Sequence, residues 1–452
     1  MTEMQQHAPI AFKEKTNLLE WAISPYGATL LSSVIFFSAW LLPPSIYSIG
    51  LDEPDYLWLD QSSFFLFASC AIAFVLGVRL ADKKVRFQRR SPIPAHIPPV
   101  PYILPPLVAT LAFGLVGVLL ILRAQPQIII ALLSGAGENI KGDLFEVALP
   151  AGIAAAGSAM LAVLYWGVNA YSAVPKGRNK KIIGRILAGY ISISFAIAFI
   201  KFSRNDLMSL ILGIMTIRIA NGIRSGRTDI REVKLVAKAL ATMVALFLMI
   251  SLLRGTSSDE LLGNFFGYTI SGYNRMAAIV HHQIPYLDAG NGDHLFNGIL
   301  QNRTINNLFP FQAMYNLPDQ LDVWLSDFTA VLGAGLMSQY TFASCFGFIF
   351  IDAGWWTPAV VFFCGVFSGH MWKRFKQNKG IGVVVYPMIF FTILMWFGTN
   401  TLISMNTIIF ILTTAALLAY ENLFKLLALA TSGIRNATPH GIANLPLPPD
   451  RM

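Results

Sequence analysis

Apolar runs close to twenty residues long recur along almost the whole chain and are separated by mostly short polar connections. About 20 apolar residues in a helix cross the hydrocarbon core of a bilayer. We therefore predict an all-α polytopic membrane protein with about ten transmembrane helices. The predicted spans cover residues 24–49, 62–81, 102–122, 147–171, 185–200, 207–219, 235–252, 355–371, 381–397 and 401–421. The fifth and sixth are short, so we expect their helices to extend into the flanking residues.

Composition supports this fold class. Of the 452 residues 55% are hydrophobic and only 13% are charged, whereas a soluble domain carries about 25% charged residues. The net charge of +9 does not indicate a nucleic-acid partner, because the charges are placed in short connections between spans. Cys70, Cys345 and Cys364 lie in or beside apolar runs without the spacing of a disulfide or a zinc site, so we expect no metal and no cofactor.

The placement of basic residues predicts the topology. The N-terminus, the connections 82–101, 172–184, 220–234 and 372–380, and the C-terminal tail, counted with the adjoining helix ends, carry 26 of the 33 lysines and arginines. Basic connections stay in the cytoplasm and contact anionic lipid headgroups. Both termini are therefore predicted to be cytoplasmic. The polar first twenty residues lack a signal-peptide pattern, so we expect the first span to remain as an anchor.

The same reading divides the chain into five parts. We predict a cytoplasmic N-terminal segment (1–23), a seven-helix membrane part (24–252), a large periplasmic loop (253–354), a three-helix membrane part (355–421) and a cytoplasmic tail (422–452) whose end is disordered. The large loop is rich in aromatic residues, so we expect it to fold, with amphipathic helices. Apolar residues at helical spacing favour one such helix over residues 260–283.

Few cations remain on the predicted outer face. Arginine binds phosphate through paired hydrogen bonds and keeps its charge, so converging outer arginines would suit a lipid diphosphate. The candidates for this role are Arg204, Arg254, Arg275 and Arg303. The alternative is that each of these side chains extends to the membrane surface or caps a helix end.

Three histidines, His281, His282 and His294, lie in the large loop, and imidazole can accept a proton near neutral pH. We take His281 and His282 as the catalytic candidates. His282 follows Arg275 by seven positions, so one helical face would carry both. The alternative is that these histidines lie on the surface of the loop and take no part in catalysis. Acidic candidates for a base also remain open: Asp206, Asp259, Glu260, Asp288, Asp293, Asp322, Asp327 and Asp352.

The centres of the predicted spans carry no ionisable residue. Ion-coupled transporters bind their coupling ion at mid-depth with such groups, so the sequence disfavours secondary transport. A passive pathway, or one that flips a lipid, stays open.

The arrangement resembles the Wzy-type oligosaccharide repeat-unit polymerases, also called O-antigen polymerases. The likeness rests on ten or more spans, one large outer loop late in the chain and few outer arginines. The local matches are Phe202-Ser-Arg-Asn205, Tyr268-Thr-Ile-Ser-Gly-Tyr-Asn-Arg275 and the glycine-rich stretch Gly333–Gly354.

This resemblance implies a membrane glycosyltransferase with a GT-C-like helical fold in a bacterial inner membrane, with its active site facing the periplasm. It would join undecaprenyl-diphosphate-linked oligosaccharides into O-antigen, capsule or exopolysaccharide, and undecaprenyl diphosphate would leave. A chain-length regulator and a flippase of the same pathway are the implied protein partners. Two alternatives remain: an enzyme of the O-antigen-ligase type, which uses the same donor, and a flippase or transporter for a lipid-linked sugar.

Overall fold

The computed structural model describes most of the chain. The described residues are 18–51, 57–82, 85–88, 97–134, 153, 155–201, 203–226, 230–253 and 261–436, the last range without 287–289, 291, 293, 297, 298, 301, 303, 304, 307, 308, 319 and 339. Within these ranges the regular structure is entirely helical, which confirms the predicted all-α class.

Seven stretches are long and apolar enough to cross a membrane: Gln61–Ala81 (α4), Pro99–Ala124 (α5), Arg178–Ile200 (α10), Arg204–Arg224 (α11), Lys234–Leu252 within α12 (Ile230–Leu253), Ser344–Lys376, and Met405–Ala430 within α21 (Met405–Asn436). This supports a multi-pass membrane protein. As expected, α10 and α11 extend well beyond the short apolar runs that predicted them.

The other three predicted spans coincide with shorter or less apolar helices. They are α2 (Pro25–Trp40), α9 (Ala156–Ala173) and α20 (Gly382–Leu394), of 16, 18 and 13 residues. The 13 residues of α20 rise only about 20 Å, less than the thickness of a hydrocarbon core. The last helix, in contrast, continues beyond its predicted span into residues expected to form the tail.

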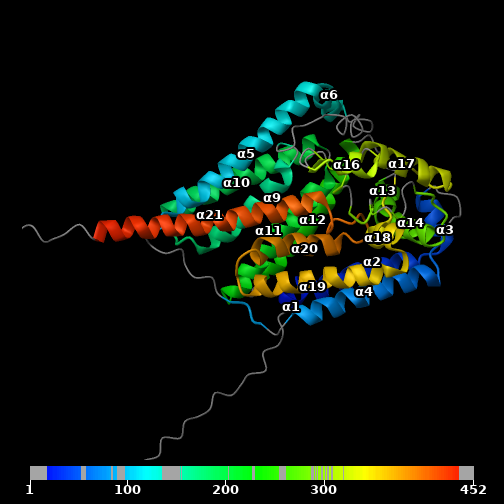
Figure 1. The fold of residues 1–452 in the computed structure, drawn as a ribbon, viewed down its shortest axis with the longest axis horizontal. Helices are drawn as coiled ribbons and strands as arrows, with labels where there is room; N and C mark the ends of the chain where they lie inside the picture. The colour runs from blue at the N-terminus through cyan, green and yellow to red at the C-terminus, as the bar shows by residue number, and fades with distance from the viewer. Residues whose placement is uncertain are drawn as a thin grey trace, which may run out of the picture.

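Short helices gather at one end of the long ones (Figure 1). They include α3 (Pro44–Leu51), α13 (Leu261–Thr269), α14 (Ser271–Val280), α16 (Phe311–Tyr315), α17 (Gln320–Gly333) and α18 (Ser344–Ala353), with α6 (Gln127–Ser134) nearby; α1 (Leu18–Ala22) precedes α2. We call the described residues between 261 and 353 the cap. The described residues of the connections that carry the basic clusters lie at the other extreme of the long helices, which we call the basic end.

The cap returns to the membrane part through a tight reversal. A 3-10 turn, η1 (Gly354–Trp356), joins α18 to α19 (Thr357–Lys376), and Gly354 has a φ of 52°, which suits glycine. Cys345 of α18 and Cys364 of α19 line one pocket. In a straight helix their 19-residue separation would span about 28 Å. The two helices therefore fold back on each other.

The membrane part is held by very close helix contacts. A Cβ atom on Gly365 of α19 would lie 2.2 Å from the carbonyl oxygen of Phe74 in α4, so only glycine fits there. Small residues that let backbones approach are typical of packed membrane helices. The Tyr386 hydroxyl of α20 donates to the Ile23 carbonyl at 2.6 Å and anchors the N-terminal helices to the same bundle.

Two cations of the basic end point into the protein. Lys376 Nζ lies 2.9 Å from Asp82 Oδ1, and the two side chains are only 6% and 12% exposed. Arg224 Nη2 donates to the Phe375 carbonyl at 2.5 Å, and the Gln88 N–H donates to the Lys376 carbonyl at 2.8 Å. These contacts join three connections of the basic end.

Candidate functional site

The cap is organised around α14, all of whose residues are buried. Asn274 fixes this helix to the connection between α3 and α4: its Oδ1 accepts from the Trp58 N–H, and its Nδ2 donates to the Tyr47 hydroxyl, both at 2.8 Å. The single helix predicted over residues 260–283 is thus two helices, α13 and α14, with a break at Ile270.

Arg275 lies in the core of the cap and is fully buried. Its Nη2 donates to the Met337 carbonyl at 2.9 Å and its Nη1 to the Ser271 carbonyl at 3.4 Å. The guanidinium carbon lies 5.8 Å from the centre of the Tyr340 ring. The side chain therefore ties α14 to the connection between α17 and α18.

Arg204 occupies the first position of α11, at the cap-side end of this helix. Its Nη2 donates to Ser251 Oγ of α12 at 2.8 Å. The guanidinium carbon lies 4.3 Å from the Phe247 ring centre and 4.5 Å from that of Tyr268. Two aromatic faces and one hydroxyl thus fix the orientation of this charge.

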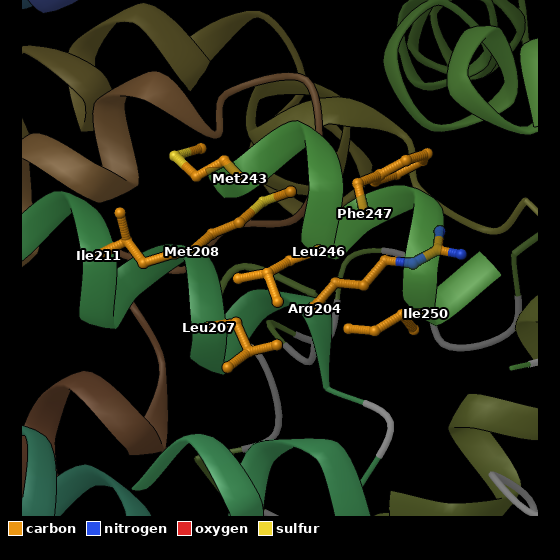
Figure 2. A pocket seen from close by; sticks show the side chains of 8 residues that line it. All are labelled: Arg204, Leu207, Met208, Ile211, Met243, Leu246, Phe247 and Ile250. Carbon is orange, nitrogen blue, oxygen red and sulfur yellow. The ribbon is translucent and has the colours of Figure 1, made fainter. Parts of the chain in front are cut away.

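A small apolar groove of about 190 Å³ lies beside Arg204, between α11 and α12. Figure 2 shows the guanidinium group at one end, turned away from the side chains of Met208, Ile211 and Met243. Several of the apolar side chains are only partly buried, so the groove opens on the side of the helix pair. Its full lining is Arg204, Leu207, Met208, Ile211, Met243, Leu246, Phe247 and Ile250.

A pair of tyrosine rings connects the surroundings of the two arginines. Tyr268, which contacts Arg204, meets Tyr340, which contacts Arg275, edge to face at 5.6 Å between ring centres. A Cβ atom on Gly267 would lie 2.1 Å from the Tyr340 ring, so glycine is needed for this approach. Arg275 in the cap and Arg204 at the adjoining end of α11 are therefore linked through this pair of rings.

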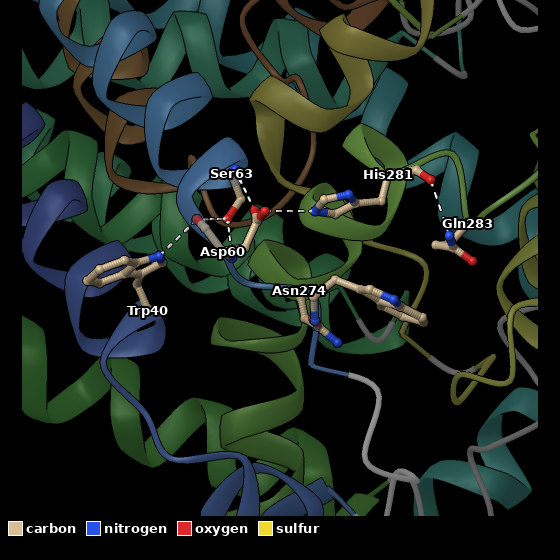
Figure 3. Close-up of polar contacts among 7 residues, drawn as sticks. Trp40, Asp60, Ser63, Asn274, His281 and Gln283 are labelled. Carbon is tan, nitrogen blue, oxygen red and sulfur yellow. Dashed lines mark hydrogen bonds and ion pairs between the residues drawn. The ribbon is translucent and has the colours of Figure 1, made fainter.

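The two histidines chosen from the sequence lie at the end of α14. His281 Nε2 lies 3.2 Å from Asp60 Oδ2 (Figure 3). His282 is exposed, with a φ of 55°. The expectation that His282 shares a helical face with Arg275 is wrong, because α14 already ends at Val280 and the backbone turns away.

Asp60 has a structural role beside His281. It is the N-cap of α4, where its Oδ1 accepts from the Ser63 N–H at 3.0 Å in a reciprocal capping box. Partial burial raises the pKa of this carboxyl, but hydrogen bonds from Ser63 and His281 and the charge of the imidazole outweigh burial and leave the pKa below its usual value. The contact joins the start of α4 to the end of α14.

The third histidine of the loop is in a different environment. His294 is buried, with Nε2 3.7 Å from Asp327 Oδ1 of α17, and the two side chains are 4% and 14% exposed. The imidazole stacks on Phe348 and meets Tyr286 edge to face, with ring centres at 6.1 and 5.2 Å. His294 and Asp327 were open candidates in the sequence, but nothing there predicted that they meet.

Two predicted diphosphate ligands, Arg254 and Arg303, lie outside the described residues, as do Asp259, Glu260, Asp288 and Asp293 among the acidic candidates. In the part of the chain that the structure describes, no three His, Cys, Asp or Glu side chains are grouped so that they could hold a metal ion.

Comparison of the chain with protein-family models, with curated proteins and with solved structures gives no match. What the protein does must therefore be inferred from its own residues.

Proposed function

We propose that the protein is a membrane glycosyltransferase that joins undecaprenyl-diphosphate-linked oligosaccharide repeat units into a surface polysaccharide. The observation that carries the proposal is the position of Arg204 at the cap-side end of an apolar groove between α11 and α12. A lipid diphosphate has the same division, with a long apolar chain and a compact anionic head.

Each part of the groove has a role in this proposal. The apolar side chains of α11 and α12 contact the first isoprene units of the lipid. Arg204, oriented by Ser251 and two aromatic rings, binds the diphosphate and stabilises the charge that develops as it leaves. Arg254 comes directly after α12 in the sequence and is the second candidate for binding the diphosphate. Arg275 holds the cap in place behind the Tyr268–Tyr340 pair.

Orientation in the membrane follows from the two ends of the molecule. The basic connections occupy the end opposite the cap, and basic connections remain in the cytoplasm. In the proposal the cap therefore faces the periplasm of a bacterial inner membrane, both termini are cytoplasmic, and α2, α9 and α20 complete ten spans. Sugars reach the cap from the periplasmic side.

The test is polymer synthesis by the purified protein in nanodiscs, supplied with undecaprenyl-diphosphate-linked repeat units of its own host. The expected product is a ladder of lengthening glycans. Intact substrate after incubation with folded protein would contradict the proposal. In a deletion strain we expect single lipid-linked repeat units to accumulate. Long lipid-linked polymer would instead favour an enzyme of the ligase type.

Arg204→Ala tests the groove directly. Hydrogen bonds to charged groups contribute about 1.5–3 kcal/mol, so kcat/KM should fall roughly 10- to 150-fold. Arg204→Lys keeps the charge and should lose less. Arg218→Ala is the matched control, because Arg218 is an exposed arginine on the same helix and does not line the groove. Equal activity of Arg204→Ala and Arg218→Ala would remove Arg204 from the diphosphate site.

A further inference from the structure

Four of the buried polar atoms in the cap that have no hydrogen-bond partner within the described structure belong to three neighbouring side chains. They are the Tyr286 hydroxyl, both ring nitrogens of His294 and Asp327 Oδ1. More than about 90% of buried polar groups in proteins are hydrogen-bonded, and each exception destabilises the fold. Even one such atom is rare in a protein, and here four of them lie in three neighbouring side chains. We call Tyr286, His294 and Asp327 the cap cluster.

The spacing within the cap cluster suits one more oxygen atom. His294 Nε2 and Asp327 Oδ1 are 3.7 Å apart, too far for a hydrogen bond between them. A single oxygen can nevertheless lie about 2.8 Å from both atoms at once. A hydroxyl group placed there lies within hydrogen-bond distance of both atoms and can donate its one proton to the imidazole.

The backbone that carries His294 is fixed from two directions. Asp352 of α18 accepts from the Gly290 N–H at 3.0 Å through Oδ1 and from the Leu295 N–H at 2.6 Å through Oδ2. Asn400, which precedes α21, donates to the Leu295 carbonyl at 2.9 Å. The separation of His294 from Asp327 is thus set by the surrounding helices.

Charges around the cluster decide which ligand fits. Burial and the Asp327 carboxylate raise the pKa of Tyr286 well above its usual range, while the Arg275 guanidinium acts weakly in the opposite direction. The phenol therefore stays neutral and can donate. Asp327 repels an anion such as a phosphate or a carboxylate. An uncharged group that both donates and accepts, as a sugar hydroxyl does, can donate to His294 and accept from a neutral phenol such as Tyr286.

We propose that the cap cluster binds a hydroxyl group of the acceptor sugar and that His294 takes its proton during glycosyl transfer. This inference rests on the proposed function. As the acceptor oxygen bonds to the anomeric carbon, the bond from that carbon to the diphosphate breaks, and its electron pair leaves with undecaprenyl diphosphate. The proton passes to His294 Nε2, and Asp327 stabilises the imidazolium.

The cluster is connected to the groove through contacts in the cap. Arg204 contacts the Tyr268 ring, Tyr268 contacts Tyr340, and Tyr340 contacts Arg275, whose charge acts on Tyr286. In the proposal, diphosphate and acceptor therefore bind on the same side of the membrane, and the cap joins the two parts of the site.

The experiment compares His294→Gln and Asp327→Asn with wild-type protein in the nanodisc assay. Glutamine keeps hydrogen bonding but cannot accept the proton. General base catalysis contributes about 10²- to 10⁴-fold, so kcat should fall by that factor in His294→Gln, with the KM for the donor unchanged. The pH profile of kcat should change as well. His370→Gln, at an exposed position of α19, is the matched control and should keep the wild-type kcat.

The outcomes separate the two proposals. No ladder from wild-type protein would contradict the proposed function. A wild-type ladder together with wild-type kcat and pH dependence in His294→Gln would overturn only the assignment of the cap cluster. A lower unfolding temperature with unchanged kcat per folded molecule would show a merely structural role and also overturn it. Should His294→Gln fail to fold, the same criteria apply to Asp327→Asn.

Discussion

The two ends of the molecule each bury a cation-forming side chain beside an aspartate, but the pairs differ in geometry. At the basic end Lys376 and Asp82 are 6% and 12% exposed and 2.9 Å apart. In the cap His294 and Asp327 are 4% and 14% exposed and 3.7 Å apart. Burial is nearly the same, yet only the first pair is hydrogen-bonded.

This difference separates a structural pair from a functional one. A buried ion pair offsets its loss of hydration only when the two groups are hydrogen-bonded, and Lys376 donates directly to Asp82. The cap pair keeps polar atoms unsatisfied at an energetic cost. Proteins tolerate such a cost mainly where the atoms serve a ligand or a reaction. The basic end should therefore determine stability, whereas the cap should determine activity.

The largest effect on stability is expected for Lys376→Ala. Removal of one partner leaves Asp82 buried without its counter-charge, which destabilises proteins by about 3–5 kcal/mol. Thermal unfolding in detergent measures the loss, and kcat per folded molecule should not change. The double variant Asp82→Leu with Lys376→Met removes both charges and should recover most of the stability. An unfolding temperature equal to wild type for Lys376→Ala would contradict the structural role.

A smaller effect is expected for Gly267→Ala in the cap. The new methyl group would overlap the Tyr340 ring, and overpacking of this kind costs about 1–3 kcal/mol. Displacement of Tyr340 should also disturb Tyr268 and Arg275, so glycan transfer should fall along with stability. Gly189→Ala in α10 is the matched control, because no atom lies within 4 Å of the added Cβ. Glycan transfer at the wild-type rate by Gly267→Ala would contradict the proposed connection between the groove and the cap cluster.

The smallest effect is expected at Asp60, whose side chain is 42% exposed. The pKa of Asp60 is lower in the folded protein than in the unfolded chain, so its charged form stabilises the fold. This stabilisation is complete at a pH above the ordinary aspartate pKa of about 3.9, and it is lost as the pH falls through the pKa of the folded protein. Asn keeps the N-cap but not the charge. Asp60→Asn should therefore lose less than about 1 kcal/mol at neutral pH, and the difference from wild type should shrink as the pH falls through the folded pKa. A difference that does not shrink on acidification would contradict this account.

Much of the membrane part could be predicted from the sequence. Apolar runs predicted α4, α5 and α10–α12 because a helix in lipid must be apolar along its length, and this requirement leaves a strong local signal. The fold-back of α18 onto α19 gave no such signal. It depends on one glycine with positive φ and on contacts between residues 19 positions apart.

The site was less predictable for a related reason. Arg204 was identified because it is one of few cations beside a short outer turn. His281 and His294 could not be distinguished in the sequence, since both are loop histidines. Their difference comes from tertiary contacts: His281 reaches the N-cap of α4, whereas His294 is buried next to Asp327 from a different helix. Pairings across an irregular segment follow no periodic pattern and require the fold.

The most direct test of the central claim is a cryo-electron microscopy structure of the protein with an undecaprenyl-diphosphate-linked repeat unit bound in nanodiscs. We expect density for the diphosphate at Arg204, for the lipid chain in the groove between α11 and α12, and for a sugar hydroxyl between His294 and Asp327. Diphosphate density at the basic end, or in the cap away from Arg204, would contradict the account.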